Sequence, residues 1–168
     1  MKPRPIIFVI MLNVTICSAH VALSASNQHT LIKSLGSAKV SLQQGLTAAQ
    51  QHGQPISGKF EVEDGKFQLS VYIMNKEQFS ELLVDYNTGK IVKSEPITQN
   101  GDLDAAKAQS TALTKARITL RAAIDKAIRG SSGLRAVGVT PALKDGHAIA
   151  SVVLLKGEEM KNVEQSLE

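Results

Sequence analysis

The chain has 168 residues, 43% of them hydrophobic, and a formal net charge of +4, so it is long enough for one ordinary domain or two very small ones. Its single cysteine excludes a disulfide scaffold and a four-cysteine zinc site. The charged fraction of 20% is typical of a globular protein and excludes intrinsic disorder.

The first 25 residues have the order of a secretory signal peptide. Lys2 and Arg4 are followed by an apolar run and then by small residues, where cleavage is expected. The run is too short to span a bilayer. Cys17 raises the alternative of lipid attachment, but Ile16 occupies a position that normally needs a small residue. We therefore predict export to the periplasm with cleavage and without a stable membrane anchor, which leaves 17 basic and 15 acidic side chains and no cysteine.

Two later segments share an order of features. Each opens with a basic residue, a β-branched residue, a hydroxyl residue and leucine, at 39–42 and again at 117–120. The hydroxyl residues, Ser41 and Thr119, are natural N-caps for the short helices that the following apolar spacing predicts.

Strands are predicted after each of these helices. Alternating apolar residues flank the Asp-Gly pairs at 64–65 and 145–146, a pattern typical of two strands joined by a type I′ hairpin. A third strand is predicted at 79–86 in the first segment and at 160–167 in the second.

These elements predict an α+β fold of two helix-plus-antiparallel-sheet repeats joined by a helical connector. β-branched Ile118 and the cap at Thr119 favour a break between the connector and the next helix. The expected organisation is a signal peptide at 1–25, an N-terminal tail or short helix at 26–38, a first repeat at 39–95, a connector helix at 96–116 and a truncated second repeat at 117–168.

The first segment closes with a distinctive turn that contains Asp85, Thr88, Gly89 and Lys90. Together with the helix, hairpin and third strand before it, this turn resembles the PepSY domain, and the second segment is similar but lacks the turn. The resemblance implies a tandem, exported, non-catalytic protein. PepSY domains occur in propeptides of thermolysin-like peptidases, where they are associated with inhibition or chaperoning, and as small periplasmic proteins. At least one such two-copy type binds lanthanide ions.

The sequence predicts no enzyme. It contains no Gly-x-Ser-x-Gly, Walker or dinucleotide-binding motif. The Gly-Ser-Ser-Gly stretch at 130–133 follows a predicted helix, whereas a nucleophile elbow needs a strand before the turn. His29, His52 and His147 are dispersed, which disfavours a zinc or haem site built from histidine alone.

Carboxylates are the better candidates for ligand binding. Hard cations such as calcium or a lanthanide bind six or more oxygens, which paired acidic turns can supply, although the spacing is not that of an EF-hand. The alternative is that these side chains are solvated strand edges, where charge discourages aggregation. The tentative metal ligands are Glu61, Glu63, Asp64, Glu77, Glu81, Asp85, Glu158 and Glu159.

The charge is unevenly distributed. Residues 101–135 carry a net charge of +4, whereas 58–95 and 136–168 each carry −2. Predicted export and the lack of stacking aromatics in the basic region exclude nucleic acid as a partner. We therefore predict a binding protein that binds or regulates an envelope protein such as a peptidase, with binding of lanthanide or calcium ions as the alternative.

Overall fold

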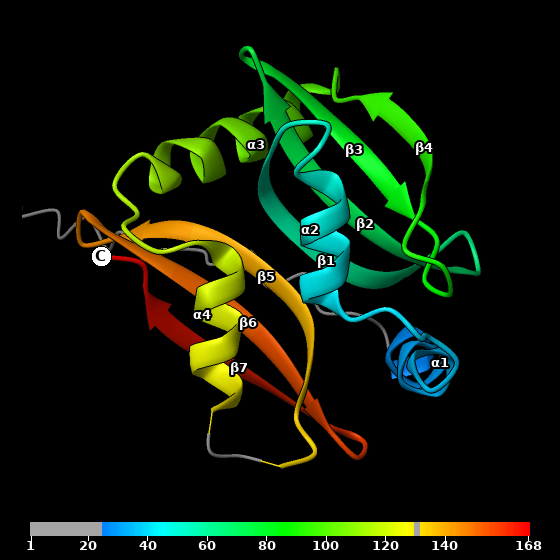
Figure 1. Cartoon of the computed structure of the whole chain (residues 1–168). Coiled ribbons are helices and arrows are strands. Elements are labelled where there is room, and N and C mark those ends of the chain that lie inside the picture. Colours follow the sequence, from blue (N-terminus) through cyan, green and yellow to red (C-terminus); the bar gives the residue numbers. More distant parts are fainter. Residues whose placement is uncertain (1–24, 130–131) are drawn as a thin grey trace, which may run out of the picture.

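The computed structural model describes residues 25–129 and 132–168, and nearly all of the predicted signal peptide lies outside them. The strands of the described residues form one seven-stranded antiparallel sheet in the order β4-β3-β2-β1-β5-β6-β7 (Figure 1). The elements are α1 (Ala25–Leu35), α2 (Leu42–Ala49), β1 (Gln54–Glu63), β2 (Lys66–Asn75), β3 (Gln78–Val84), β4 (Ile91–Pro96), α3 (Asn100–Leu113), α4 (Leu120–Ile128), β5 (Arg135–Lys144), β6 (His147–Lys156) and β7 (Glu159–Ser166).

The predicted architecture of two helix-plus-antiparallel-sheet repeats joined by a helical connector is wrong. All strands belong to one sheet because β1 pairs with β5, with Gly58 opposite Val139 and Lys59 opposite Gly138. Two separate sheets would each expose an unpaired backbone edge here, and the pairing satisfies both edges. Side-chain alternation predicts strands, but it does not specify which strand edges meet.

Helices α2 and α4 lie on the same face of the sheet, which we call the helical face (Figure 1). Their apolar stripes, such as Leu46 of α2 and Ile124 of α4, are buried in the main core with Val71 and Val152 of the sheet. Helix α1, in the predicted N-terminal tail, adds buried residues to the same core. The core therefore runs continuously under both segments of the chain.

The predicted N-caps are confirmed. The Ser41 hydroxyl accepts the Gln44 N–H at 3.2 Å, and the Thr119 hydroxyl accepts the Ala122 N–H at 3.1 Å. Each bond satisfies one N–H that the first turn of a helix leaves without a partner. The two helices accordingly begin where the sequence predicts.

Both predicted hairpins are also present. Asp64 and Gly65 have φ angles of 48° and 74°, and Asp145 and Gly146 have 51° and 81°. A type I′ turn needs positive φ at both central residues, and asparagine, aspartate and glycine tolerate it best. The turns fix the register of β1 with β2 and of β5 with β6.

Helix α3 lies on the opposite face of the sheet, which we call the outer face. Ile56 of β1 and Phe79 of β3 pack there against Ala106 of α3. The Ser57 hydroxyl donates to the Gln109 side chain at 2.7 Å and ties α3 to β1. Helix α3 falls within the predicted connector, and it ends before α4 as predicted.

Candidate cation site

Polar side chains from three neighbouring strands meet on the outer face. Glu61 and Glu63 are two residues apart on β1, so both point to one face of the sheet. Tyr72 of β2 lies directly opposite Glu81 of β3 in the register. Because β1, β2 and β3 are adjacent, these strands bring three carboxylates and one phenol together.

The three carboxylates form a compact cluster. One oxygen each from Glu61, Glu63 and Glu81 lies within 4.8 Å of the other two. The Gln68 amide nitrogen donates to Glu63 Oε2 at 2.7 Å and to Glu61 Oε1 at 3.4 Å. The Lys59 ammonium lies 2.6 Å from Glu61 Oε2. These donors offset part of the repulsion between the carboxylates, and the net charge of the cluster together with Lys59 remains negative.

Glu81 carries an unsatisfied acceptor. Its Oε1 atom is buried and has no hydrogen-bond partner among the described residues. A buried acceptor left without a partner costs about 1–3 kcal/mol, and more when it is charged. Such an atom calls for an explanation, for example a bound water or ion. The Glu81 carboxylate belongs to the cluster, so a cation held there is one partner that would satisfy this atom.

The phenol of Tyr72 stays protonated beside the cluster. Burial raises the pKa of Tyr72 well above its ordinary value, and the negative charges of Glu61 and Glu81 and a hydrogen bond to the Glu81 side chain raise it further. The Lys59 ammonium lies 5.7 Å from the centre of the Tyr72 ring, within range of a cation–π interaction. Tyr72 therefore places a neutral hydroxyl group and an aromatic ring next to the carboxylates.

A cavity of about 420 Å³ adjoins the cluster. Glu63, Tyr72 and Glu81 of the sheet line it, together with Asp102 in the first turn of α3. Glu95 of β4, which is opposite Glu81 in the register, also lines it. Lys59 also lines the cavity, but acidic side chains predominate among its charged residues, so a hydrated cation can approach the carboxylates there.

The other predicted metal ligands lie elsewhere. Asp64 and Glu77 lie in the turns that follow β1 and β2, with φ angles of 48° and 67°. Glu158 precedes Glu159 at the start of β7. Among the described residues, only Glu61, Glu63 and Glu81 of the predicted ligands come together as a potential metal-binding group.

Asp85 has a structural role in the turn between β3 and β4. Its Oδ1 atom accepts the Thr88 N–H at 2.7 Å, the Asn87 N–H at 2.9 Å and the Thr88 hydroxyl at 3.0 Å. The bonds from Thr88 and Asn87 lower the pKa of Asp85. Gly89 has a φ of 75°, and the Lys90 N–H lies 3.4 Å from Thr88 Oγ1. The predicted family turn is thus an Asx-type turn whose carboxylate already has its donors.

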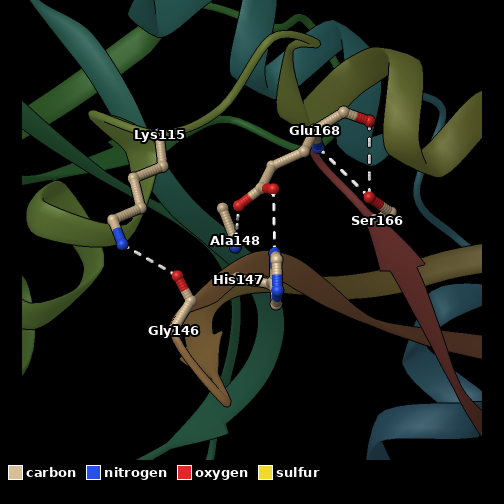
Figure 2. A network of polar contacts seen from close by, with 6 residues as sticks. All are labelled: Lys115, Gly146, His147, Ala148, Ser166 and Glu168. Carbon is tan, nitrogen blue, oxygen red and sulfur yellow. Dashed lines mark hydrogen bonds and ion pairs between the residues drawn. The ribbon is translucent and has the colours of Figure 1, made fainter.

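A second polar network surrounds Glu168 (Figure 2). Glu168 Oε1 accepts the Ala148 N–H at 2.8 Å, and Oε2 lies 3.0 Å from His147 Nδ1. The Lys115 ammonium donates to the Gly146 carbonyl at 2.8 Å. The hydrogen bond to His147 and the bond from Ala148 lower the pKa of Glu168. The two contacts of Glu168 tie it to the start of β6, and Lys115 ties the segment before α4 to the preceding turn, so the network has a structural explanation.

Sequence reasoning missed Lys59, Gln68 and Tyr72. Alternation along β1 places Lys59 on the same face as Glu61, and the hairpin register places Gln68 opposite Glu61. The Asp-Gly turn at 64–65 fixes that register, so the positions of Lys59 and Gln68 beside Glu61 could have been predicted from the sequence.

Comparisons with known proteins leave the family open. No family model and no curated protein matches the chain. Among solved structures, the chain is similar to a protein from Clostridium difficile 630 that is provisionally described as a lipoprotein, with 13% identity over 71% of this chain and 80% of that one and a TM-score of 0.42. This likeness is too weak to carry an argument, and the PepSY resemblance stays a prediction. No helix in the described part of the chain is long and apolar enough to cross a membrane.

Proposed function

We propose that this protein binds a hard cation, of the calcium or lanthanide type, at Glu61, Glu63 and Glu81. The observation that carries the proposal is the buried and unpartnered Oε1 of Glu81, whose carboxylate belongs to the three-carboxylate cluster. All three ligands are carboxylates, which hard cations prefer to nitrogen or sulfur donors.

The donor set fits the coordination that such ions require. Calcium takes about 6–8 oxygen ligands at flexible geometry, and carboxylates bind it through one or both oxygens. Glu61, Glu63 and Glu81 supply the first of these oxygens, and water from the adjoining cavity supplies others. The Gln68 side chain, which contacts two of the carboxylates, holds them in place.

Lys59 competes for the same oxygens. Its ammonium lies 2.6 Å from Glu61 Oε2, while 48% of the Lys59 side chain remains exposed to solvent. A divalent or trivalent ion is attracted to three carboxylates more strongly than a single ammonium is. Cation binding in this proposal therefore displaces Lys59 from Glu61 into solvent.

Calorimetric titration of the protein with calcium chloride and with terbium chloride tests the proposal. We expect saturable uptake, weakened about tenfold or more by Glu81→Gln and by Glu61→Gln. The matched control is the double variant Glu158→Gln/Glu159→Gln, which removes two carboxylates outside the cluster and should bind like the parent chain. Absence of uptake at millimolar calcium and micromolar terbium, or equal weakening in the control, would contradict the proposal.

A protein partner, the other function predicted from the sequence, stays a prediction. The outer edges of β4 and β7 are the places where an extended segment of a partner would add a strand. Both strands carry charged residues, such as Lys93 and Lys161, and this is a common protection of sheet edges against association. The cation site is therefore the function that the geometry supports better.

A further inference from the structure

A second cavity, of about 250 Å³, lies where the ends of α2, α3 and α4 approach β1. Leu46 of α2, Leu113 of α3 and Ile118 of the following linker contribute apolar side chains to its wall. Arg117 and Arg121 also line it. We call this space the seam cavity, because both segments of the chain contribute to it.

The seam cavity is electropositive. Arg117 and Arg121 line it, and none of the described acidic residues does. The nine-residue helix α4 begins there, at its N-cap Thr119, so the positive end of the helix dipole adds to the two guanidinium charges. The Arg121 Nη1 atom donates to Thr47 Oγ1 at 3.1 Å, which holds this guanidinium against α2.

Arg117 is held by its backbone. Its N–H donates to the Leu167 carbonyl at 2.6 Å. Within the described residues its guanidinium makes no hydrogen bond or ion pair, and the side chain is exposed. The Arg117 guanidinium therefore has donors available for an anion.

We propose that the seam cavity binds a small aliphatic carboxylate. Its hydrocarbon chain packs against Leu113, Ala116 and Ile118, and its carboxylate accepts hydrogen bonds from Arg117 and Arg121. Arginine is suited to this role because its planar guanidinium can donate two parallel N–H groups to one carboxylate. The volume lies just below the range of about 300–1,000 Å³ that is usual for ligand pockets, which restricts the ligand to a short chain.

This proposal is independent of the cation site. The seam cavity is bordered by Leu46 and Leu120, which belong to the core of the helical face, whereas the carboxylate cluster lies on the outer face. Glu81→Gln should therefore leave carboxylate binding unchanged, and the two proposals can fail separately.

A nuclear magnetic resonance titration of the full chain with octanoate, below its micellar concentration, tests the proposal. We expect saturable shifts of the methyl signals of Leu113, Ala116 and Ile118. Octylamine, which carries the opposite charge, and acetate, which lacks the chain, should not produce them. No saturable shift at millimolar octanoate, or equal shifts with octylamine, would overturn the proposal.

Amino-acid substitutions test the contribution of the arginine charges separately from that of the cavity volume. Arg117→Gln and Arg121→Gln should each weaken octanoate binding about tenfold. Arg129→Gln, which removes an exposed arginine just beyond the other end of α4, is the matched control and should bind like the parent chain. Ala116→Leu should block binding by filling the cavity, and if it fails to fold the arginine variants still decide. Parent-like affinity in the double variant Arg117→Gln/Arg121→Gln would contradict the assignment.

Discussion

The backbone carbonyls of Tyr86 and Leu167 make the same contact in the two segments of the chain. The Tyr86 carbonyl accepts the N–H groups of residues 39 and 40 at 2.9 and 3.0 Å, and the Leu167 carbonyl accepts those of residues 117 and 118 at 2.6 and 3.1 Å. Each contact anchors the residues before a helix N-cap to the chain at the end of β3 or β7. Helices α2 and α4 therefore start at equivalent points relative to the sheet.

The two helix N-caps, Ser41 and Thr119, should each contribute measurably to the free energy of unfolding. Ser41→Ala and Thr119→Ala should each lower the free energy of unfolding by about 1 kcal/mol. Ser41→Ala removes only the bond to the Ser41 hydroxyl, because the other capping-box bond, in which the Gln44 side chain accepts the residue 41 N–H at 2.8 Å, uses the backbone. Urea unfolding measures both, with Ser94→Ala on exposed β4 as the control. An unfolding free energy unchanged by Ser41→Ala would contradict this account of the helix start.

Gly45 should resist substitution although it lies inside α2. A Cβ atom at this position would lie 2.7 Å from Leu69 Cδ2, and Leu69 is fully buried. Helix propensity alone favours alanine by about 1 kcal/mol, whereas overpacking a core costs about 1–3 kcal/mol. We expect Gly45→Ala to destabilise the protein in urea unfolding, with Gly101→Ala, whose Cβ would contact nothing, as the control. A stabilised Gly45→Ala variant would show that α2 does not pack this closely.

Short-range patterns predicted the local structure well. Ser41 contacts Gln44, and the turn at 64–65 is set by two adjacent residues, so a few positions of sequence contain the necessary information. The pairing of Gly58 with Val139 joins residues far apart in the chain, and no local pattern contains it. The single sheet could therefore not be predicted, although its strands could.

The candidate site was predicted in part for the same reason. Period-two alternation placed Glu61 and Glu63 on one face, and that prediction was sufficient for β1. Glu81 joins them only through the pairing of β3 with β2, which sets it opposite Tyr72. Glu158 precedes β7 and Glu159 begins it, at the far end of the strand order, and neither belongs to the cluster.

Removal of Lys59 should strengthen cation binding. Lys59→Gln eliminates the ammonium that contacts Glu61, so the cation no longer competes with it. Exposed ion pairs contribute about 0.2–1 kcal/mol, which corresponds to a gain in affinity of up to about fivefold. Calorimetric titration with calcium measures the change, and Lys144→Gln, which breaks the exposed ion pair with Glu164 away from the cluster, is the control. A weaker or unchanged calcium affinity for Lys59→Gln would contradict the proposal that the cation displaces Lys59 from Glu61.

Asp85 should make stability depend on pH in the acidic range. Hydrogen bonds from Thr88 and Asn87 hold the pKa of Asp85 below its ordinary value in the folded state. The resulting stabilisation is complete above the ordinary carboxyl pKa, and it is lost as the pH falls through the lower folded-state pKa. Asp85→Asn removes the titrating group, so urea unfolding across this range should show a shallower pH dependence. An identical pH dependence in both proteins would rule out this contribution.

Terbium luminescence tests the central claim most directly, because energy transfer from a nearby tyrosine sensitises a bound terbium ion. The chain has no tryptophan and two tyrosines, and Tyr72 adjoins the carboxylate cluster whereas Tyr86 packs with the core of the helical face. We predict that tyrosine excitation produces terbium emission that Tyr72→Phe abolishes, that Tyr86→Phe preserves and that calcium competes away. Emission that depends on Tyr86, or that persists unchanged in Glu81→Gln, would contradict a cation site at Glu61, Glu63 and Glu81.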